Sequence, residues 1–254
     1  MERLRHVARS EGIDPTIVVA ETVDAVTSLR PTPSELVPLC RNLVERNPTC
    51  GPLWWLCARL LAKPEGLADA WHLVDEIEGD DTPARLADAL PDDVTVLTVG
   101  YPAMTARALR RRAGVSVVAG LTGEDGGRMV RAMDRAGVDV EPVLPEAMLD
   151  AMRRVDLVLL EADACSTVTV VAPMGTGLAA VAALAIGVPV WLVAGRGRRL
   201  PVPFVEAIGR RLDAEHEEFP TSYLLKVAGP EGVVPMSSDA LQAECPAIPE
   251  LLPP

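Results

Sequence analysis

Asp163 and Cys165 are the two side chains of this sequence best placed to do chemistry. Asp163 follows the apolar run 157–160, so its carboxylate is expected at the end of a buried strand. Partial burial there would raise its pKa and suit it to general acid–base catalysis, although an aspartate in this place is also a common turn or helix cap. Cys165 would be a nucleophile if a helix end lowered its pKa, and is otherwise a small core residue.

Glycine-rich turns and arginine runs offer places for an anionic ligand. The segment 174–177 (Met-Gly-Thr-Gly) precedes an expected helix, whose free N–H groups favour an anion, but its glycines would equally serve close packing. The turn 123–127 contains Gly126 and two carboxylates, so a solvated turn is expected there. Two basic runs, 107–112 and 196–199, could reach a phosphate, although such runs are more often solvated faces.

These residues would be positioned by alternating strands and helices in the last two-thirds of the chain. Strands are expected at 94–99, 115–119, 138–143, 157–160 and 188–193, and helices at 105–112, 126–136, 145–154 and 178–186. This alternation predicts βαβ units and a parallel sheet. Ligands bind beyond the carboxyl ends of such strands, which selects residues 100–101, 120–126, 161–166 and the loop before Gly177.

The first third of the chain is expected to be helical. Helices open at Asp14-Pro15 and at 31–35, and apolar helices are expected at 53–62 and 67–77. The predicted fold class is therefore α/β. A helical N-terminal domain, residues 1–90, precedes a Rossmann-like, mainly parallel sheet domain, residues 91–254, which would bind the ligand.

The composition excludes several classes of protein. The 254 residues are 49% hydrophobic and carry a net charge of −12, so no direct binding of nucleic acid or of an anionic membrane is expected. Five cysteines without a C-x-x-C pair, and three histidines, do not predict a metal site. Prolines and glycines interrupt the uncharged stretch 165–195, so it does not predict a membrane span. Residues 1–10 lack the apolar run of a secretory signal, and the expected compartment is cytoplasmic.

Several motifs occur in order from Arg46 to the C-terminus. The longest, residues 152–164 (MRRVDLVLLEADA), is similar to the pattern M-x-x-V-D-x-V-L-V-G-A-D-A. Four shorter segments are each similar to a further pattern. Residues 46–54 are similar to A-R-P-T/S-x-A-P-L-W-N, and residues 96–101 to I-L-T-x-G/S/C-Y/N. Residues 174–190 are similar to N-K-x-G-T-x-x-L-A with G-V-P-V, and residues 228–235 to T-E-E-G-V-V-P. Together they resemble the α/β/δ-type subunits of translation initiation factor 2B. Relatives of that family are methylthioribose-1-phosphate isomerase and ribose-1,5-bisphosphate isomerase. The resemblance implies a helical domain followed by a Rossmann-like domain.

The resemblance also implies a ligand cleft in which Asp163 matches the catalytic aspartate of the isomerases. The ligand-binding residues expected in it are Arg46, Thr49, Thr98, Gly100, Tyr101, Gly126, Gly175 and Thr176. The isomerases' cysteine, two residues after the strand-end threonine, falls at Gly100 here, so the thiol is absent. Their phosphate-holding arginine falls within 119–122, and their Asn-Lys pair at 172–173, where this chain has no such groups.

Three functions stay open on this reasoning. The favoured one is a protein that binds a small phosphorylated metabolite or nucleotide without standard isomerase activity. The second is a diverged sugar-phosphate aldose-ketose isomerase, in which Asp163 works with Cys165, Cys50 or Tyr101. The third is a non-catalytic assembly subunit. No cofactor is expected in any of them.

Self-association is a further expectation from the resemblance. Family members pair through the α/β domain, so a homo-oligomer, in the simplest case a homodimer, is expected here. The apolar residues of the C-terminal segment 241–254 would either pack across that interface or lie on their own domain.

Overall fold

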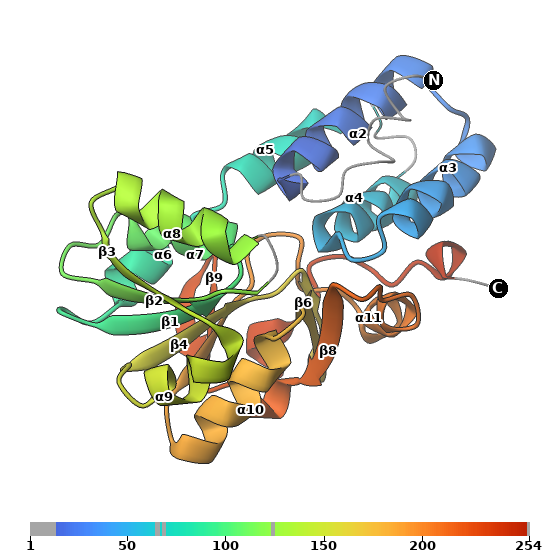
Figure 1. Cartoon of the computed structure of the whole chain (residues 1–254). Coiled ribbons are helices and arrows are strands. Elements are labelled where there is room, and N and C mark those ends of the chain that lie inside the picture. Colours follow the sequence, from blue (N-terminus) through green and yellow to red (C-terminus); the bar gives the residue numbers. More distant parts are fainter. Residues whose placement is uncertain (1–13, 64–66, 68–69, 123–124, 253–254) are drawn as a thin grey trace.

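The structure, a computed structural model, describes residues 14–63, 67, 70–122 and 125–252. Residues 1–10, where no secretory signal is expected, lie outside the described part, as do residues 123–124 of the acidic turn. Figure 1 shows a helical bundle at one end of the molecule and a sheet flanked by helices at the other.

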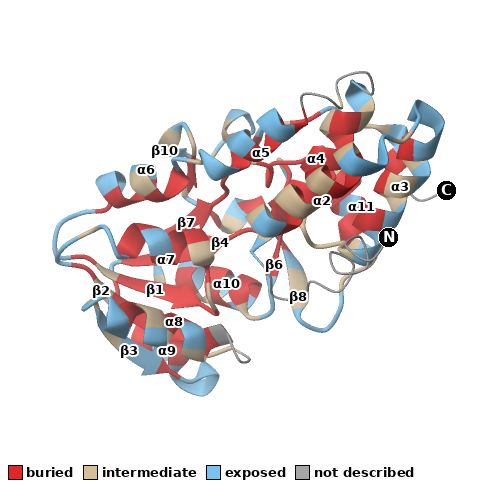
Figure 2. Ribbon diagram, turned by 90° about the horizontal axis from the view of Figure 1, so that it is seen from above, coloured by how far each residue is buried: buried red, intermediate tan, exposed pale blue. Residues whose placement is uncertain are grey.

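Four helices, α2 (Pro15–Leu29), α3 (Pro33–Arg46), α4 (Gly51–Ala62) and α5 (Trp71–Glu78), form the bundle. Side-chain caps fix two of their starts: Asp14 accepts a hydrogen bond from the Thr16 N–H at 2.9 Å, and Thr32 and Glu35 form a capping box. α4 is buried along most of its length, including Trp54 and Trp55 (Figure 2). The helical first third predicted from the sequence is therefore present.

The larger sheet of the described chain has the strand order β10-β9-β7-β4-β1-β2-β3. Its strands are β1 (Thr95–Val99), β2 (Ser116–Gly120), β3 (Asp139–Val143), β4 (Leu157–Glu161), β7 (Val190–Val193), β9 (Lys226–Gly229) and β10 (Gly232–Pro235). Every neighbouring pair is parallel except the antiparallel β9–β10 hairpin. The α/β class with a mainly parallel sheet is confirmed.

Helices cover both faces of this sheet (Figure 1). One face carries α6 (Thr82–Ala89), α7 (Ala103–Leu109) and α8 (Asp125–Arg135), and the other α9 (Met148–Met152) and α10 (Thr176–Ile186). The core between the layers is aliphatic, as the few aromatic residues require. α6 falls within the predicted helical domain but packs on the sheet through Leu86, so the boundary at residue 90 stays a prediction.

A small antiparallel sheet, β5-β6-β8, lies between the larger sheet and the bundle, and the sequence did not predict it. Its strands are β5 (Ala164–Cys165), β6 (Thr169–Pro173) and β8 (His216–Pro220), and α11 (Val202–Gly209) packs on β6. Phe204 of α11 and Trp54 of α4 have ring centroids 5.3 Å apart. The small sheet and α11 therefore share one core with the helical bundle.

The C-terminal segment packs on its own chain. Leu251, in the 3₁₀ turn Pro249–Leu251, is buried against the bundle, with Ile248 and Leu252 partly buried beside it. Leu241, in the turn Asp239–Leu241, is buried against the sheet. Of the two alternatives left by the sequence, packing on the chain itself is the one observed. Shorter 3₁₀ turns at Pro145–Ala147 and Thr221–Tyr223 complete the elements.

None of the helices in the described ranges is both long and apolar enough to cross a bilayer. The uncharged stretch 165–195 instead forms β5, β6, α10 and β7.

Gly51, the first residue of α4, lies directly against the backbone between β4 and β5. An added Cβ would overlap the carbonyl oxygen of Asp163 and lie 3.2 Å from the Ala164 Cβ. We expect Gly51→Ala to lower the free energy of unfolding by ~1–3 kcal/mol in urea, because the overlap forces the bundle and the small sheet apart. The control is Gly127→Ala, whose Cβ would meet the movable end of Arg131 and which should be neutral or stabilising. Equal midpoints for the two variants would contradict the close contact.

Candidate functional site

A cavity lies where the parallel strands end. The chain runs from β1 to β2 and β3 on one side and returns to β4 on the other, so β1 and β4 flank the reversal of strand order, where ligands bind in such folds. The cavity, here called the rim cavity, is about 50 Å³ and is lined by Val99, Tyr101, Pro102, Leu160, Glu161, Asp163, Pro173 and Thr176. This volume suits a few water molecules and is far below the roughly 300 Å³ of a small-molecule site. The lining contains two carboxylates and no cation.

Asp163 lies at this edge of the sheet, as the sequence predicted. Its N–H donates to the Val171 carbonyl at 2.9 Å, and its Oδ2 is buried without a hydrogen-bond partner. Burial raises the pKa of its carboxyl to about 6, and the neighbouring Arg198 and His216 oppose part of that rise. A carboxyl with this pKa exchanges a proton near neutral pH, which is what general acid–base catalysis requires.

His216 faces Asp163, a pairing that the sequence did not indicate. The His216 Nε2 lies 3.7 Å from Asp163 Oδ2, which is longer than a hydrogen bond, and its Nδ1 lies 2.7 Å from Asp213 Oδ1. Asp213 also accepts from the Glu215 N–H at 2.9 Å. The imidazole is thus held between two carboxylates. The contact depends on the β6–β8 pairing, which brings together residues distant in sequence, and no local motif signals it.

A buried ion pair lies beside the rim cavity. Glu161 Oε1 is 3.1 Å from Arg198 Nη2, and the two side chains are 7% and 6% exposed. Glu161 Oε2 accepts hydrogen bonds from the N–H groups of Met104 and Thr105, at 3.0 Å each. Arg198 also donates to the Ala162 carbonyl. Glu161 occupies the glycine position of the family motif, so this chain's own carboxylate takes up a buried cation and backbone donors that would otherwise suit an anion.

At the start of α10, too, a carboxylate of this chain accepts a hydrogen bond from the backbone. Gly175 has φ 94°, a left-handed conformation that favours glycine, and Thr176 lines the rim cavity. The Gly177 N–H donates to Glu217 Oε1 at 2.8 Å. The negative charge expected at this helix start is therefore supplied by Glu217 of β8.

Three expected residues lie together at the end of β1. Thr98 is buried and its Oγ1 has no hydrogen-bond partner, and Gly100 adopts φ 65°. Tyr101 lines the rim cavity, with the guanidinium of Arg128 4.6 Å from the centre of its ring. Arg128 of α8 thus brings to this edge a cation that no sequence motif indicated.

The other expected ligand-binding residues do not line the cavity. Arg46 is exposed at the end of α3, and Thr49 lies in the turn before α4. Gly126 is buried in the first turn of α8, where an added Cβ would lie 2.6 Å from the Leu121 Cα. The site therefore brings Asp163, Tyr101 and Thr176 together. Six other expected residues are outside its lining: Arg46, Thr49, Thr98, Gly100, Gly126 and Gly175.

The thiols are not activated in this structure. Burial raises the pKa of Cys165, in β5, to about 12 and that of Cys50, at the start of α4, to about 11. Neither is a thiolate at neutral pH, so neither supplies the activated sulfur that nucleophilic catalysis needs. The geometry of Cys165 is that of a small core residue.

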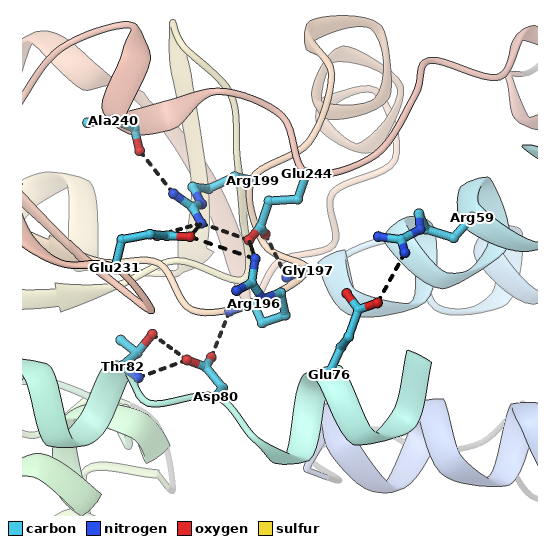
Figure 3. A network of polar contacts seen from close by, with 10 residues as sticks. All are labelled: Arg59, Glu76, Asp80, Thr82, Arg196, Gly197, Arg199, Glu231, Ala240 and Glu244. Atoms are coloured by element: carbon cyan, nitrogen blue, oxygen red, sulfur yellow. Dashed lines mark hydrogen bonds and ion pairs between the residues drawn. The ribbon is translucent and has the colours of Figure 1, made fainter. Parts of the chain in front are cut away.

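The basic run 196–199 is engaged within the chain (Figure 3). Arg199 Nη2 lies 3.0 Å from Glu231 and 2.7 Å from Glu244, and Arg196 Nη1 lies 2.9 Å from Glu244. Asp80, just before α6, accepts from the Arg196 N–H at 2.7 Å. This network ties the C-terminal segment and the α5–α6 connection to the sheet, so these arginines form neither a fully solvated face nor a phosphate site. No cluster suited to a metal occurs in the described ranges.

Removal of one partner of the buried Glu161–Arg198 pair should lower the stability of the fold strongly. We expect Glu161→Gln to lower the free energy of unfolding by ~3–5 kcal/mol in urea, because the buried Arg198 loses its counter-charge. The double variant Glu161→Gln/Arg198→Met should recover part of that loss. Glu141→Gln, which breaks the exposed pair with Arg154 at 2.9 Å, is the control and should cause no measurable change. Equal effects of Glu161→Gln and Glu141→Gln would contradict the assignment.

Comparison with known proteins gives matches in structure alone. No protein-family model and no curated protein sequence matches this chain. Translation initiation factor eIF-2B of Pyrococcus horikoshii OT3 is similar over 94% of this chain and 98% of its own, with a TM-score of 0.76 and 17% identity.

Two structures from Chaetomium thermophilum are also similar to this chain in fold at low sequence identity. A chain of the tetrameric eIF2B-beta2-delta2 complex has a TM-score of 0.78 and 15% identity over 94% of this chain and 91% of that one. eIF2B delta has a TM-score of 0.71 and 17% identity over 90% and 96%. The resemblance seen in the sequence motifs is confirmed at the level of the fold: this chain has the fold of the initiation factor 2B subunits.

Proposed function

We propose that this protein is a non-catalytic assembly protein that forms homo-oligomers through α10. The observation that carries the proposal is an exposed apolar stripe, here called the α10 stripe, formed by Met174, Leu178, Val181 and Leu184. Leu178, Val181 and Leu184 are 66%, 41% and 52% exposed and follow the spacing of one helix face. α10 contains no charged residue. A helix that is apolar on every face is ordinarily buried on every face, and a second copy would cover this stripe.

The surroundings of the α10 stripe support the same proposal. α9 packs beside α10, and Leu144 and Leu149 near it are exposed as well. The net charge of −12 makes an uncharged surface the favourable place for two identical chains to meet. One of the structures with the same fold is a chain of a tetrameric complex.

Several features of the sequence and the structure argue that isomerase activity is not retained. The cysteine of the isomerases is absent, and the phosphate-holding groups at 119–122 and 172–173 are absent too. The rim cavity is about 50 Å³, and Glu161 and Glu217 already satisfy the nearby backbone donors. The five free cysteines are consistent with the reducing cytoplasm proposed as its compartment.

Binding of a small phosphorylated ligand is the second candidate. Arg128 beside Tyr101 favours it, because this cation stands at the rim cavity edge and could attract an anion. Since the cavity is small and acidic, such binding requires the cavity to open and the phosphate to stay near Arg128.

Calorimetric titration with ribose-1,5-bisphosphate tests this second candidate. Binding that Arg128→Gln abolishes and Arg131→Gln, the control on the same helix, leaves intact would support it. No heat of binding up to millimolar concentration is the result that the assembly proposal expects.

A charge placed on the α10 stripe tests self-association. We expect the wild-type chain to be a dimer or larger at micromolar concentration and Leu178→Glu to be a monomer, measured by light scattering after gel filtration. Glutamate in the first turn of a helix is favourable, so α10 itself should persist. Ile17→Glu, an equally apolar exposed site on α2, is the control and should leave the mass unchanged. A monomeric wild-type chain would refute the proposal.

A further inference from the structure

We propose that a groove between α11 and the small sheet binds a small organic amine, a molecule that carries an ammonium group on a compact apolar body. The groove, here called the α11 groove, has a volume of about 310 Å³. Its lining comes from α11 and the residue after it, from β6 and β8, and from the connection between β5 and β6. None of these residues lines the rim cavity or belongs to the α10 stripe, so the α11 groove is separate from both.

The α11 groove exists because α11 covers only part of the small sheet. Val171 of β6 and Glu218 of β8 are paired in the antiparallel register, so their side chains lie on the same face of the sheet. α11 packs on β6, and Val171 is buried in the core that α11 shares with the helical bundle. Glu218, on the neighbouring strand, stays exposed. The uncovered space between the helix and β8 is the groove.

One face of α11 forms the wall opposite β8. Val202, Val205, Glu206 and Gly209 follow one another at the spacing of a single helix face. Val205 is buried and Val202 half-buried, and Val168 of the β5–β6 connection adds a third valine to the lining. The volume lies at the lower end of the roughly 300–1,000 Å³ of small-molecule sites. The groove therefore offers an apolar surface to a ligand of few non-hydrogen atoms.

The charged groups of the α11 groove carry a net negative charge. Glu206 and Glu218 supply two carboxylates, and Arg210 supplies one cation. Arg210 Nη2 lies 3.9 Å from Glu206 Oε2, and because both side chains are largely exposed this ion pair is weak. The Glu218 carboxylate has no hydrogen bond or ion pair within the ranges that the structure describes. It is thus the group of the groove that is left to bind a cation.

The end of α11 lies beside the same carboxylate. A Cβ added at Gly209, the last residue of the helix, would overlap Glu218 Oε2. The last carbonyl groups of a helix carry partial negative charge, so they add to the attraction that Glu218 exerts on a cation. A phosphate or a carboxylate would be repelled at this end of the groove. The lining contains no aromatic ring to stack on a quaternary ammonium, so a primary ammonium, which donates hydrogen bonds, is the cation that fits.

Titration with benzylamine, followed by amide NMR of the full chain, tests the site. We expect saturable shifts at the Val205, Gly209 and Glu218 amides with a dissociation constant on the order of 1 mM, because the ligand has few atoms. Benzyl alcohol, which has the same shape without the charge, should bind at least about tenfold more weakly, and benzoate should not bind. Three results would overturn the proposal: no saturable shift at these amides, equal binding of benzyl alcohol, or a preference for benzoate.

Two variants separate the site from a merely structural role of the same residues. Glu218→Gln should weaken benzylamine binding about tenfold, whereas Glu215→Gln, an exposed control just before β8, should bind as the wild type. Gly209→Ala places a methyl group where the Glu218 carboxylate lies, so it should weaken binding as well. Its midpoint of unfolding in urea should stay equal or rise, because alanine is favoured over glycine in a helix. Unchanged benzylamine affinity in both Glu218→Gln and Gly209→Ala would contradict the assignment.

Discussion

The buried pair of Glu161 and Arg198 determines what the carboxyl edge of the parallel sheet can do. Two charges removed from water are tolerated because each is matched by the other and by hydrogen bonds to the backbone of α7 and to the Ala162 carbonyl. The backbone donors and the cation that would attract a ligand's anion are thereby used within the chain. Asp163, two residues further along the chain, is left with a buried oxygen and an imidazole neighbour.

The sequence predicted the elements whose own residues carry the signal. β1, β2, β3, β4 and β7 appear as runs of apolar and β-branched residues bounded by glycines and polar residues, and α10 follows a glycine-rich turn, so local pattern sufficed for these elements. The short strands β9 and β10 of the same sheet were not predicted. Asp163 was found because it follows such a run. The small sheet was missed because β8 reads His-Glu-Glu-Phe-Pro and is held by pairing with β6, which no local pattern expresses. His216 and Arg198 were missed as partners of Asp163 for the same reason: both reach it from distant segments.

The fold tolerates many changes of sequence, whereas the site depends on a few positions. At 14–17% identity the chain keeps the architecture of the initiation factor 2B subunits over about nine-tenths of its length. Aliphatic residues at the right period are enough to maintain that architecture, since many combinations fill the same core. A site depends on a few positions, and at position 161 this chain has a glutamate that pairs with the buried Arg198.

The chain's own carboxylates occupy the places where a phosphate would bind. A crystal structure determined in the presence of millimolar phosphate would test this arrangement. We expect that Glu161 stays on Arg198, Glu217 stays on the Gly177 N–H, and the space beside Asp163 contains water alone. A phosphate coordinated by Arg198 or by the start of α10, with either glutamate displaced, would contradict it.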